Sequence, residues 1–311
     1  MNRYLLLKAI QLLREHTVLR SKRAFPGVYD FRQTTASPHS LGFDFSDSRF
    51  VHVGDQLFFE PILRQLRVHG FTVKVIPTVA MREYFVDAGY SVVSVPEMLA
   101  QDLRVAPIWM YDSIDRQERT RRFVYINSAD HGMILPVTNH LTKYLMRLLN
   151  VEFDERAADC RPHKITGESA LINGITGPIL IYNDSVDSGG FRLSKMHYGK
   201  LLEIAEGKQR EGYTLVRVGT NAERTGNPKG LPFPHIDLRG ETSVLDLFRL
   251  LGSANTVGSI SFDTVIAHLA LLYEKPAWIC MRIFSKSHAE HVRRFVWPSY
   301  LSEHPVSIHY L

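Results

Sequence analysis

The feature that most limits the possible folds is a regular alternation of short apolar runs with helical patterns, which occurs twice along the chain. In the first series, apolar runs at residues 49–53, 72–77 and 91–96 alternate with helical patterns at 57–69 and 80–89. A strand–helix–strand series of this kind predicts a parallel sheet with right-handed crossovers. We therefore expect an α/β protein.

A second series of the same kind follows a polar stretch between Glu152 and Gly177, which we take as a domain boundary. Its strands are expected at residues 178–184, 213–219, 256–262 and 276–282, and its helices at 194–206, 244–254 and 263–273. One more strand at 121–130 and a helix at 140–151 extend the first series. The fold predicted is two Rossmann-like domains that face each other across a cleft, residues 46–160 and 161–311, preceded by residues 1–45.

Residues 1–24 combine Leu and Ile at helical spacing with basic side chains, which is typical of an amphipathic helix on an anionic membrane surface. A helix packed on its own domain explains the pattern as well. The following residues, up to about 48, are rich in Gly, Pro, Ser and Thr and are expected to form an irregular connector.

The bulk composition is that of an ordinary globular protein. The 311 residues are 45% hydrophobic and 22% charged, and the formal net charge of +5 suits an anionic partner. The basic residues are scattered along the chain, which argues against a nucleic-acid binder. No apolar run is long enough to span a membrane, and Cys160 and Cys280 lack the spacing of a zinc site or disulfide framework, so we expect a cytoplasmic protein without a bound metal or cofactor.

Asp55 follows Gly54 at the end of the expected strand 49–53, directly before a helix. In parallel sheets, ligands bind beyond the carboxyl ends of the strands, so this carboxylate is a candidate for chemistry. The alternative is that Asp55 only caps the helix.

Asp263 and Thr264 stand in the same relation to the strand 256–262 and the helix after it. Unpaired backbone N–H groups at a helix start can receive a phosphate, and the Thr264 hydroxyl can add a hydrogen bond. Capping of the helix is again the alternative. His268 lies one turn into this helix, where a structural role is equally open. Upstream, Thr242 or Ser243 can cap the helix at 244–254, and Asp246 completes a box-like spacing.

The residues carry a resemblance to a known family. The segment GDQLFFEPILRQLR (residues 54–67) resembles the Gly-Asp motif and Pro-containing helix of the ADP-heptose:lipopolysaccharide heptosyltransferases. The segment at 237–278 resembles the carboxyl-terminal part of the same family, where a Gly-x-Thr-Ser helix precedes a strand, an Asp-Thr pair, a His and a Lys-Pro. The resemblance implies the GT-B fold and an inverting glycosyltransferase that needs no metal ion.

The resemblance also implies roles for individual residues. Asp55 matches the aspartate that acts as general base on the acceptor hydroxyl, with Gly54 and Gln56 beside it in the acceptor site. The donor diphosphate is expected at the helix start, and the candidate donor-binding residues are Arg192, Gly219, Asp263, Thr264, Val265 and His268. The implied partners are a nucleotide diphosphate sugar, with heptose as one candidate sugar, and a lipid-linked or polysaccharide acceptor at the inner face of the membrane.

Two positions depart from the family pattern. Val265 stands where the family commonly has glycine, which restricts the approach of a phosphate to the backbone. Phe191 stands at the position of a lysine, and Arg192 beside it can supply the cation. A sugar-nucleotide epimerase of the same fold and a nucleotide-sugar binding protein without turnover remain as alternatives.

Overall fold

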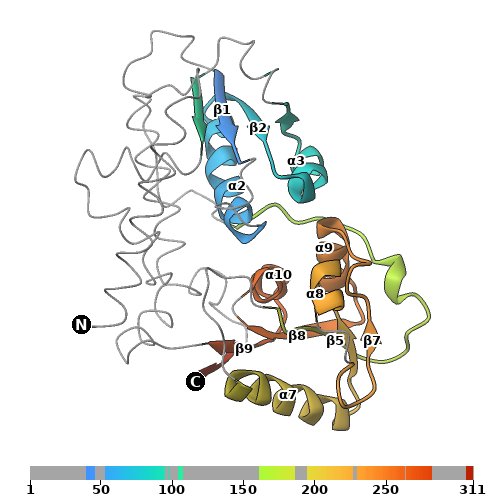
Figure 1. Ribbon diagram of the computed structural model, residues 1–311. Coiled ribbons are helices and arrows are strands. Elements are labelled where there is room, and N and C mark those ends of the chain that lie inside the picture. Colours follow the sequence, from blue (N-terminus) through green and yellow to red (C-terminus); the bar gives the residue numbers. More distant parts are fainter. Residues whose placement is uncertain are drawn as a thin grey trace, which may run out of the picture.

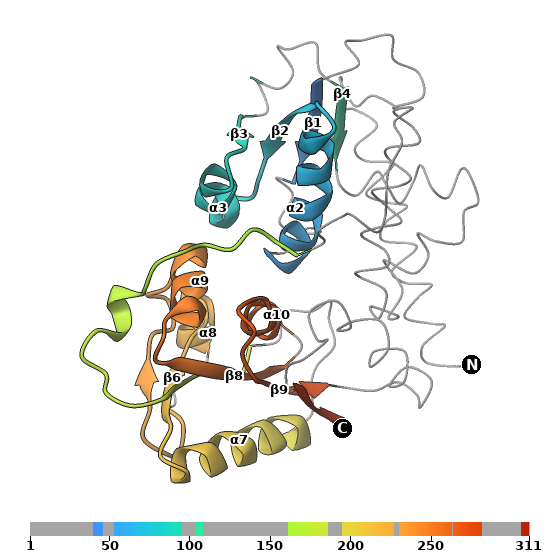
Figure 2. The ribbon, with the colours of Figure 1, turned by 180° about the vertical axis from the view of Figure 1, so that it is seen from behind.

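The computed structural model describes residues 40–45, 53–94, 97, 104–107, 161–185, 195–226, 230–262, 264–281 and 306–310. These residues form a mixed α/β structure with two parallel sheets (Figures 1 and 2). The expected strand at 121–130, the helix at 140–151 and the basic helix at 1–24 lie outside the described residues. Among the residues searched, no helix has the length and apolar character that a membrane span requires.

The first sheet has four parallel strands in the order β3-β2-β1-β4. Its strands are β1 (Ser40–Asp44), β2 (Thr72–Ile76), β3 (Ser91–Val92) and β4 (Arg104–Pro107). The helices of this half are α2 (Val53–Val68), the 3-10 helix η2 (Val79–Met81) and α3 (Arg82–Asp87). The buried side chains of β2 and α2 belong to one hydrophobic cluster, so α2 packs on the sheet.

The position of the first strand corrects the sequence interpretation. The connector was expected to extend to about residue 48, but Ser40–Asp44 forms β1, which pairs with β2 on one side and β4 on the other. The expected strand at 49–53 is wrong at its end, because Val53 already belongs to α2. Phe43 and Phe45 are buried and supply the apolar contacts of this segment, while its Ser, Gly and Asp residues resemble a turn.

The second sheet has six parallel strands in the order β10-β9-β8-β5-β6-β7. Its strands are β5 (Ile179–Asn183), β6 (Thr214–Arg217), β7 (Ile236–Asp237), β8 (Thr256–Phe262), β9 (Ala277–Met281) and β10 (Val306–Tyr310). The helices here are η5 (Ala170–Ile172), α7 (Lys195–Arg210), α8 (Asn221–Gly226), α9 (Val244–Gly252) and α10 (Val265–Leu272). The predictions of β5, β6, β8, β9, α7, α9 and α10 are confirmed to within a few residues.

Helices cover both faces of this sheet (Figure 1). Ile179 and Ile181 of β5 join the cluster that contains α9 and α10, whereas Leu180 and Tyr182 join the cluster beneath α7. All five residues of β5 are therefore buried, which explains why this strand is a nearly continuous apolar run. At Gly258 of β8 an added Cβ would lie 2.5 Å from the Pro276 carbonyl oxygen, so only glycine permits this close approach of the strands.

The helix α9 begins with the predicted capping box. The Ser243 hydroxyl accepts a hydrogen bond from the Asp246 backbone N–H (3.2 Å), and the Asp246 carboxylate accepts one from the Ser243 N–H (2.9 Å). The segment Asn221–Gly226, for which no helix was predicted from the sequence, forms α8. Thr220 and Glu223 make a second reciprocal pair at its start, with distances of 2.8 and 3.2 Å.

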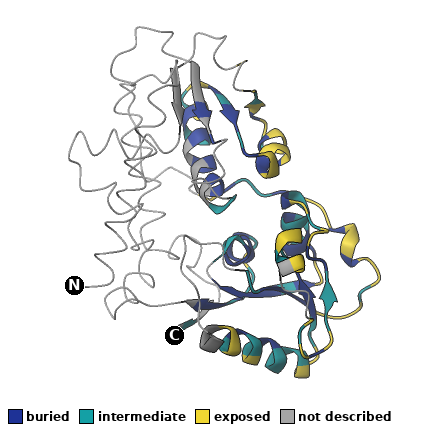
Figure 3. Cartoon of the chain, viewed as in Figure 1, coloured by how far each residue is buried: buried dark blue, intermediate teal, exposed yellow. Residues whose placement is uncertain are grey.

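A single hydrophobic cluster reaches from the first sheet to α9 and α10, and Figure 3 shows buried residues along α2, α9 and α10. At the junction the rings of Tyr84 in α3 and Phe248 in α9 stack with their centroids 5.0 Å apart. The connecting segment, residues 161–178 before β5, forms hydrogen bonds with helices of both halves. The His163 backbone N–H donates to Glu60 of α2 (2.8 Å), and the Tyr273 hydroxyl donates to the carbonyl of Ile165 (2.5 Å).

Candidate functional site

Each sheet has one place where the strand order reverses, and such switch points are where ligands bind in open α/β sheets. In the first sheet this place is between β1 and β4, and in the second it is between β8 and β5. The helix α10 follows β8, and the polar residues Asn183, Asp184 and Ser185 follow or end β5. The carboxyl ends of β5 and β8 therefore form the candidate donor site.

Thr264 is the N-cap residue of α10, but its side chain does not cap the helix. Its backbone is extended (φ −137°, ψ 172°), and its carbonyl oxygen accepts the N–H of Ala267 (3.1 Å). The hydroxyl oxygen is buried and has no hydrogen-bond partner among the residues that the structure describes. A buried hydroxyl normally finds a partner, so this one is suited to an atom of a bound ligand.

Asn183, the last residue of β5, has a second unpartnered atom at the same switch point. Its side chain is buried and its Nδ2 donates to the carbonyl of Val218 (2.9 Å), which fixes the amide. Within the described part of the chain, the buried Oδ1 accepts no hydrogen bond. Because Asn183 pairs with Ser261 of β8, the two unpartnered atoms belong to neighbouring strand ends.

The other expected donor residues divide into two groups. Val265 is the first residue of α10 and His268 lies one turn into it, and both are half-buried. The side chain of Val265 is packed against the hydrophobic cluster of the junction. Asp263 and Arg192 lie outside the described residues.

Gly219 follows β6 and is surrounded by charged side chains. An added Cβ would overlap the Glu223 carboxylate and lie 3.2 Å from Cγ of Arg239, so a larger residue here would displace the Glu223 side chain from its present contacts. The same Glu223 carboxylate accepts the N–H of Thr220 (2.8 Å) and the hydroxyl of Ser185. The pair of Gly219 and Glu223 thus connects the end of β6 to the end of β5.

Two nearly inaccessible arginines hold the strand ends in place. Arg217 donates two hydrogen bonds to Asp184 (2.6 and 3.2 Å). Arg239 does the same with Asp237 (2.7 and 2.9 Å), and these hydrogen bonds hold the pKa of the Asp237 carboxyl at about 2. Bidentate pairs of this kind fix geometry as well as charge. The Asp184 side chain follows β5, retains some exposure (14%) and is held in one orientation by Arg217 of β6.

Four polar residues at these strand ends were not predicted from the sequence: Asn183, Asp184, Arg217 and Glu223. A signal was present for Glu223, because Thr220 and Glu223 have the spacing of a capping box directly after a strand. Asn183 and Asp184 also end an apolar run, like Asp55 in the sequence interpretation. The arginines gave no signal, since their partners are known only from the folded chain.

Asp55 is the third residue of α2 and so lies within the first helical turn. Asp55 is therefore not the N-cap residue of α2. Its carboxylate is still favourable in the first turn, because the positive end of the helix dipole lies there. The placement of its side chain is outside what the structure describes. Gly54 is also in α2, where an added Cβ would meet no atom within 4 Å.

Gln56 is fully buried and uses both ends of its amide. Its Nε2 donates to the Thr78 hydroxyl (2.8 Å), and its Oε1 accepts the Thr78 backbone N–H (3.2 Å). These bonds join α2 to the loop after β2. We therefore interpret Gln56 as a residue that positions the start of α2, and no longer as an acceptor contact.

The fold brings the two candidate regions together. The helix α2, which carries Asp55, contacts α10, which begins at the donor site, and both views show the beginning of α2 beside α10 (Figures 1 and 2). Among the residues searched, no three His, Cys, Asp or Glu side chains are grouped so that they could hold a metal ion.

Comparisons with known proteins found similar folds among solved structures but no match in the two sequence-based searches. A scan against protein-family models found no match, and a search of curated proteins found none. Among solved structures, the bacterial iron-containing dodecameric glycosyltransferase TibC from enterotoxigenic E. coli H10407 matches with 12% identity and a TM-score of 0.52, over 78% of this chain and 57% of TibC.

The dodecameric heptosyltransferase TibC in complex with ADP-D-beta-D-heptose matches with 12% identity and a TM-score of 0.51, over 80% of this chain and 60% of that chain. The E. coli ADP-heptose LPS heptosyltransferase II matches with 13% identity and a TM-score of 0.48, over 87% of this chain and 92% of that chain. The chain thus spans well under two thirds of the length of TibC, whose fold it shares.

Proposed function

We propose that the protein is a glycosyltransferase of GT-B architecture that transfers a sugar, with heptose as the leading candidate, from a nucleotide diphosphate donor. The acceptor we propose is a bacterial lipopolysaccharide or surface polysaccharide, and the transfer inverts the anomeric centre without a metal ion. The observation that carries the proposal is the buried Thr264 hydroxyl at the start of α10, which has no hydrogen-bond partner among the described residues; the same holds for the amide oxygen of Asn183 at the neighbouring strand end. The fold shared with TibC, whose complex contains ADP-D-beta-D-heptose, supports this choice.

In this proposal the donor diphosphate lies at the start of α10. The first backbone N–H groups of a helix are unpaired and carry the positive end of the helix dipole, so they stabilise negative charge there. The Thr264 hydroxyl donates to a phosphate oxygen, Arg192 supplies a cation, and Asp263 contributes its backbone at the helix start, not its carboxylate. As the diphosphate leaves, its negative charge grows, and these groups stabilise it more strongly in the transition state than in the bound donor.

Asp55 is the proposed general base. The acceptor oxygen forms its bond to the anomeric carbon from the face opposite the diphosphate, the bond from that carbon to the phosphate oxygen breaks, and the acceptor proton moves to the Asp55 carboxylate. The nucleoside diphosphate leaves with the electron pair of the broken bond. The contact of α2 with α10 supports this assignment, since it brings the helix of the base to the helix of the leaving group.

The proposed place of action is the cytoplasmic face of a membrane. The basic residues of the first 24 positions, Arg3, Lys8, Arg14, Arg20, Lys22 and Arg23, stand among Leu and Ile, which suits a peripheral contact with anionic lipids. A lipid-linked acceptor would then be presented at the surface where the enzyme docks.

The test is a calorimetric titration of the full-length protein with ADP, GDP, UDP and CDP, followed by the Thr264→Val variant. We expect one nucleoside diphosphate to bind and the variant to lose about 10-fold or more in affinity, because valine keeps the shape but leaves the ligand oxygen without its donor. The control is Thr225→Val, whose hydroxyl donates to carbonyl groups of its own helix. The proposal is overturned if none of the four nucleotides binds.

A nucleotide-sugar binding protein without turnover is the second candidate, because Val265 begins α10 where a smaller residue would leave the backbone more accessible. It predicts donor binding that no acceptor converts to free nucleoside diphosphate. Release of the diphosphate from ADP-D-beta-D-heptose on addition of lipopolysaccharide core would exclude it.

A further inference from the structure

Tyr198 is an aromatic residue that belongs to neither hydrophobic cluster of the described residues. It lies in the first turn of α7, and 37% of its surface is exposed although most large apolar side chains around it are buried. Its ring stands edge-on to Phe262, the last residue of β8, with centroids 5.3 Å apart. Tyr198 therefore lies at the carboxyl end of β8, on the α7 side of the sheet, while α10 begins on the other side.

The surroundings of the Tyr198 hydroxyl are acidic. Partial burial raises the pKa of the phenol, and the carboxylates of Asp184 and Glu223 raise it further. The phenol thus keeps its proton and acts as a hydrogen-bond donor at neutral pH. Within the described part of the chain, no hydrogen bond of this hydroxyl is present.

The same carboxylates determine what the hydroxyl can recognise. Asp184 and Glu223 repel a phosphate oxygen, so an anionic group is a poor partner at this position. Neutral hydroxyl groups of a sugar ring accept a hydrogen bond from the phenol and can also donate to carboxylates nearby. The exposed part of the aromatic ring offers an apolar surface for the C–H groups of such a ring.

We propose that Tyr198 recognises a sugar ring of the donor by donating a hydrogen bond to one of its hydroxyl groups, and so helps to determine which donor binds. This inference rests on the proposed function, which places the diphosphate at the start of α10. The phosphate and the sugar are then bound from opposite sides of the same strand ends, by Thr264 and by Tyr198. The ring can be the ribose of the nucleotide or the sugar to be transferred.

The experiment compares Tyr198→Phe with Tyr213→Phe in calorimetric titrations of the full-length protein. Phenylalanine keeps the ring against Phe262 and removes only the hydroxyl. Tyr213 is the matched control, because it precedes β6 at the opposite end of the sheet, with its ring near Lys208. The ligands are the tightest-binding of ADP, GDP, UDP and CDP, its 2′-deoxy and 3′-deoxy forms, and its sugar ester, which is ADP-D-beta-D-heptose if ADP binds best.

We expect Tyr198→Phe to weaken binding by about 2- to 10-fold and Tyr213→Phe to leave it unchanged. If the ring is the ribose, the loss appears with the nucleoside diphosphate and disappears with one of the deoxy forms. If the ring is the transferred sugar, the loss appears only with the sugar ester. Equal affinity of Tyr198→Phe and the native protein for every ligand overturns the inference, as does an equal loss for inorganic pyrophosphate. Failure of all four nucleotides to bind the native protein instead overturns the proposed function.

Discussion

At the scale of single residues, Asp55 is the position where function and stability can be separated. It is the third residue of α2, and Asp246 is the third residue of α9, so the two aspartates share the same place in a helix. Only Asp246 has a described role in capping, as the partner of Ser243. The pair therefore offers a matched comparison.

We expect Asp55→Asn to lower the rate of transfer by about 10²- to 10⁴-fold, because the amide cannot accept the acceptor proton. Donor affinity, measured by calorimetry, should remain, since the diphosphate site is on α10. Asp246→Asn should instead lower the free energy of unfolding by about 1 kcal/mol and leave the rate of transfer intact. An Asp55→Asn variant with near-native turnover would remove the general-base assignment.

At the scale of secondary-structure elements, the most unusual contact is a buried carboxylate that joins α2 to the connecting segment. Glu60 is 1% exposed, and it accepts hydrogen bonds from the His163 backbone N–H (2.8 Å) and the Tyr90 hydroxyl (3.0 Å). Burial raises its pKa above the ordinary value of 4.5, which outweighs the opposite effects of Arg64 and of these hydrogen bonds. The ionised form therefore costs folding free energy at neutral pH.

The sign of the pH dependence follows from this raised pKa. Below pH 4.5 Glu60 is protonated in both the folded and the unfolded protein and has no effect on their balance. As the pH rises through the raised pKa of the folded state, the buried Glu60 carboxyl must ionise and the free energy of unfolding of the native protein falls. The Glu60→Gln variant has no ionisable group there and does not lose this stability. The stability of the variant relative to the native protein should thus increase as the pH rises above 4.5, as measured by urea unfolding.

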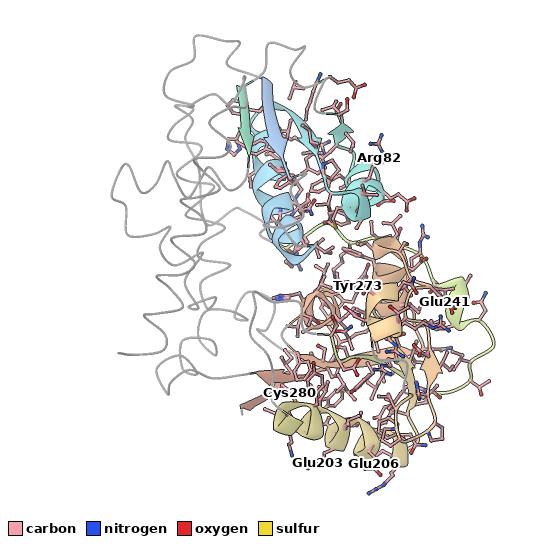
Figure 4. The ribbon with its side chains drawn as sticks, in the orientation of Figure 1. Arg82, Glu203, Glu206, Glu241, Tyr273 and Cys280 are labelled. Atoms are coloured by element: carbon pink, nitrogen blue, oxygen red, sulfur yellow. The ribbon has the colours of Figure 1, made fainter. Side chains whose placement is uncertain are left out.

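The control is Glu206→Gln, which makes the same change at a more exposed position of α7 (Figure 4), where the carboxylate meets Arg210. We expect no comparable trend there, because solvent screens an exposed charge. A Glu60→Gln variant whose relative stability falls as the pH rises would contradict the burial argument.

The elements also show where sequence reasoning succeeds. The strands β5 and β8 were predicted because both faces of a central parallel strand are buried, so nearly every residue is apolar. The capping box of α9 was predicted because its chemistry lies within four consecutive residues. By contrast, β1 was missed because its apolar residues alternate with Ser, Gly and Asp, which are typical of turns. Its pairing with β2 and β4 comes from distant sequence.

The residues of the candidate site also fall into those that the sequence predicts and those that it does not. The position of Thr264 at a helix start could be predicted from the sequence, because a strand ends and a helix begins there. The buried hydrogen bonds of Gln56 could not be predicted, because its partner Thr78 is distant in sequence and no local pattern marks the pair. The Arg217–Asp184 pair was missed for the same reason. Contacts that depend on packing between elements have no local signal.

At the scale of the whole molecule, the two sheets share one hydrophobic cluster, and Phe248 lies within it between Tyr84 and Tyr273. In Figure 4, Tyr273 lies beside α9 in the half that contains the six-stranded sheet. Phe233 belongs to the separate cluster beneath α7. Both phenylalanines are buried, but only Phe248 reaches the first half of the chain.

We expect Phe248→Ala to lower the free energy of unfolding by about 3 to 5 kcal/mol. Hydrogen exchange measured by mass spectrometry should rise in peptides from α3 as well as in those from α9, because the ring connects the two halves. Phe233→Ala should raise exchange in the six-stranded sheet and leave α3 protected. If Phe248→Ala leaves exchange in α3 unchanged, the two halves are energetically independent.

The stacking of Tyr84 on Phe248 also bears on how the chain is made in the cell. Synthesis proceeds from the N-terminus, so α3 leaves the ribosome well before the residues that form α9. During that interval the Tyr84 ring, fully buried in the finished protein, lacks the Phe248 ring that stacks on it. The early half of the nascent chain therefore leaves part of the Tyr84 ring without its native partner until translation has passed Phe248, and transiently exposed apolar surface of this kind favours aggregation.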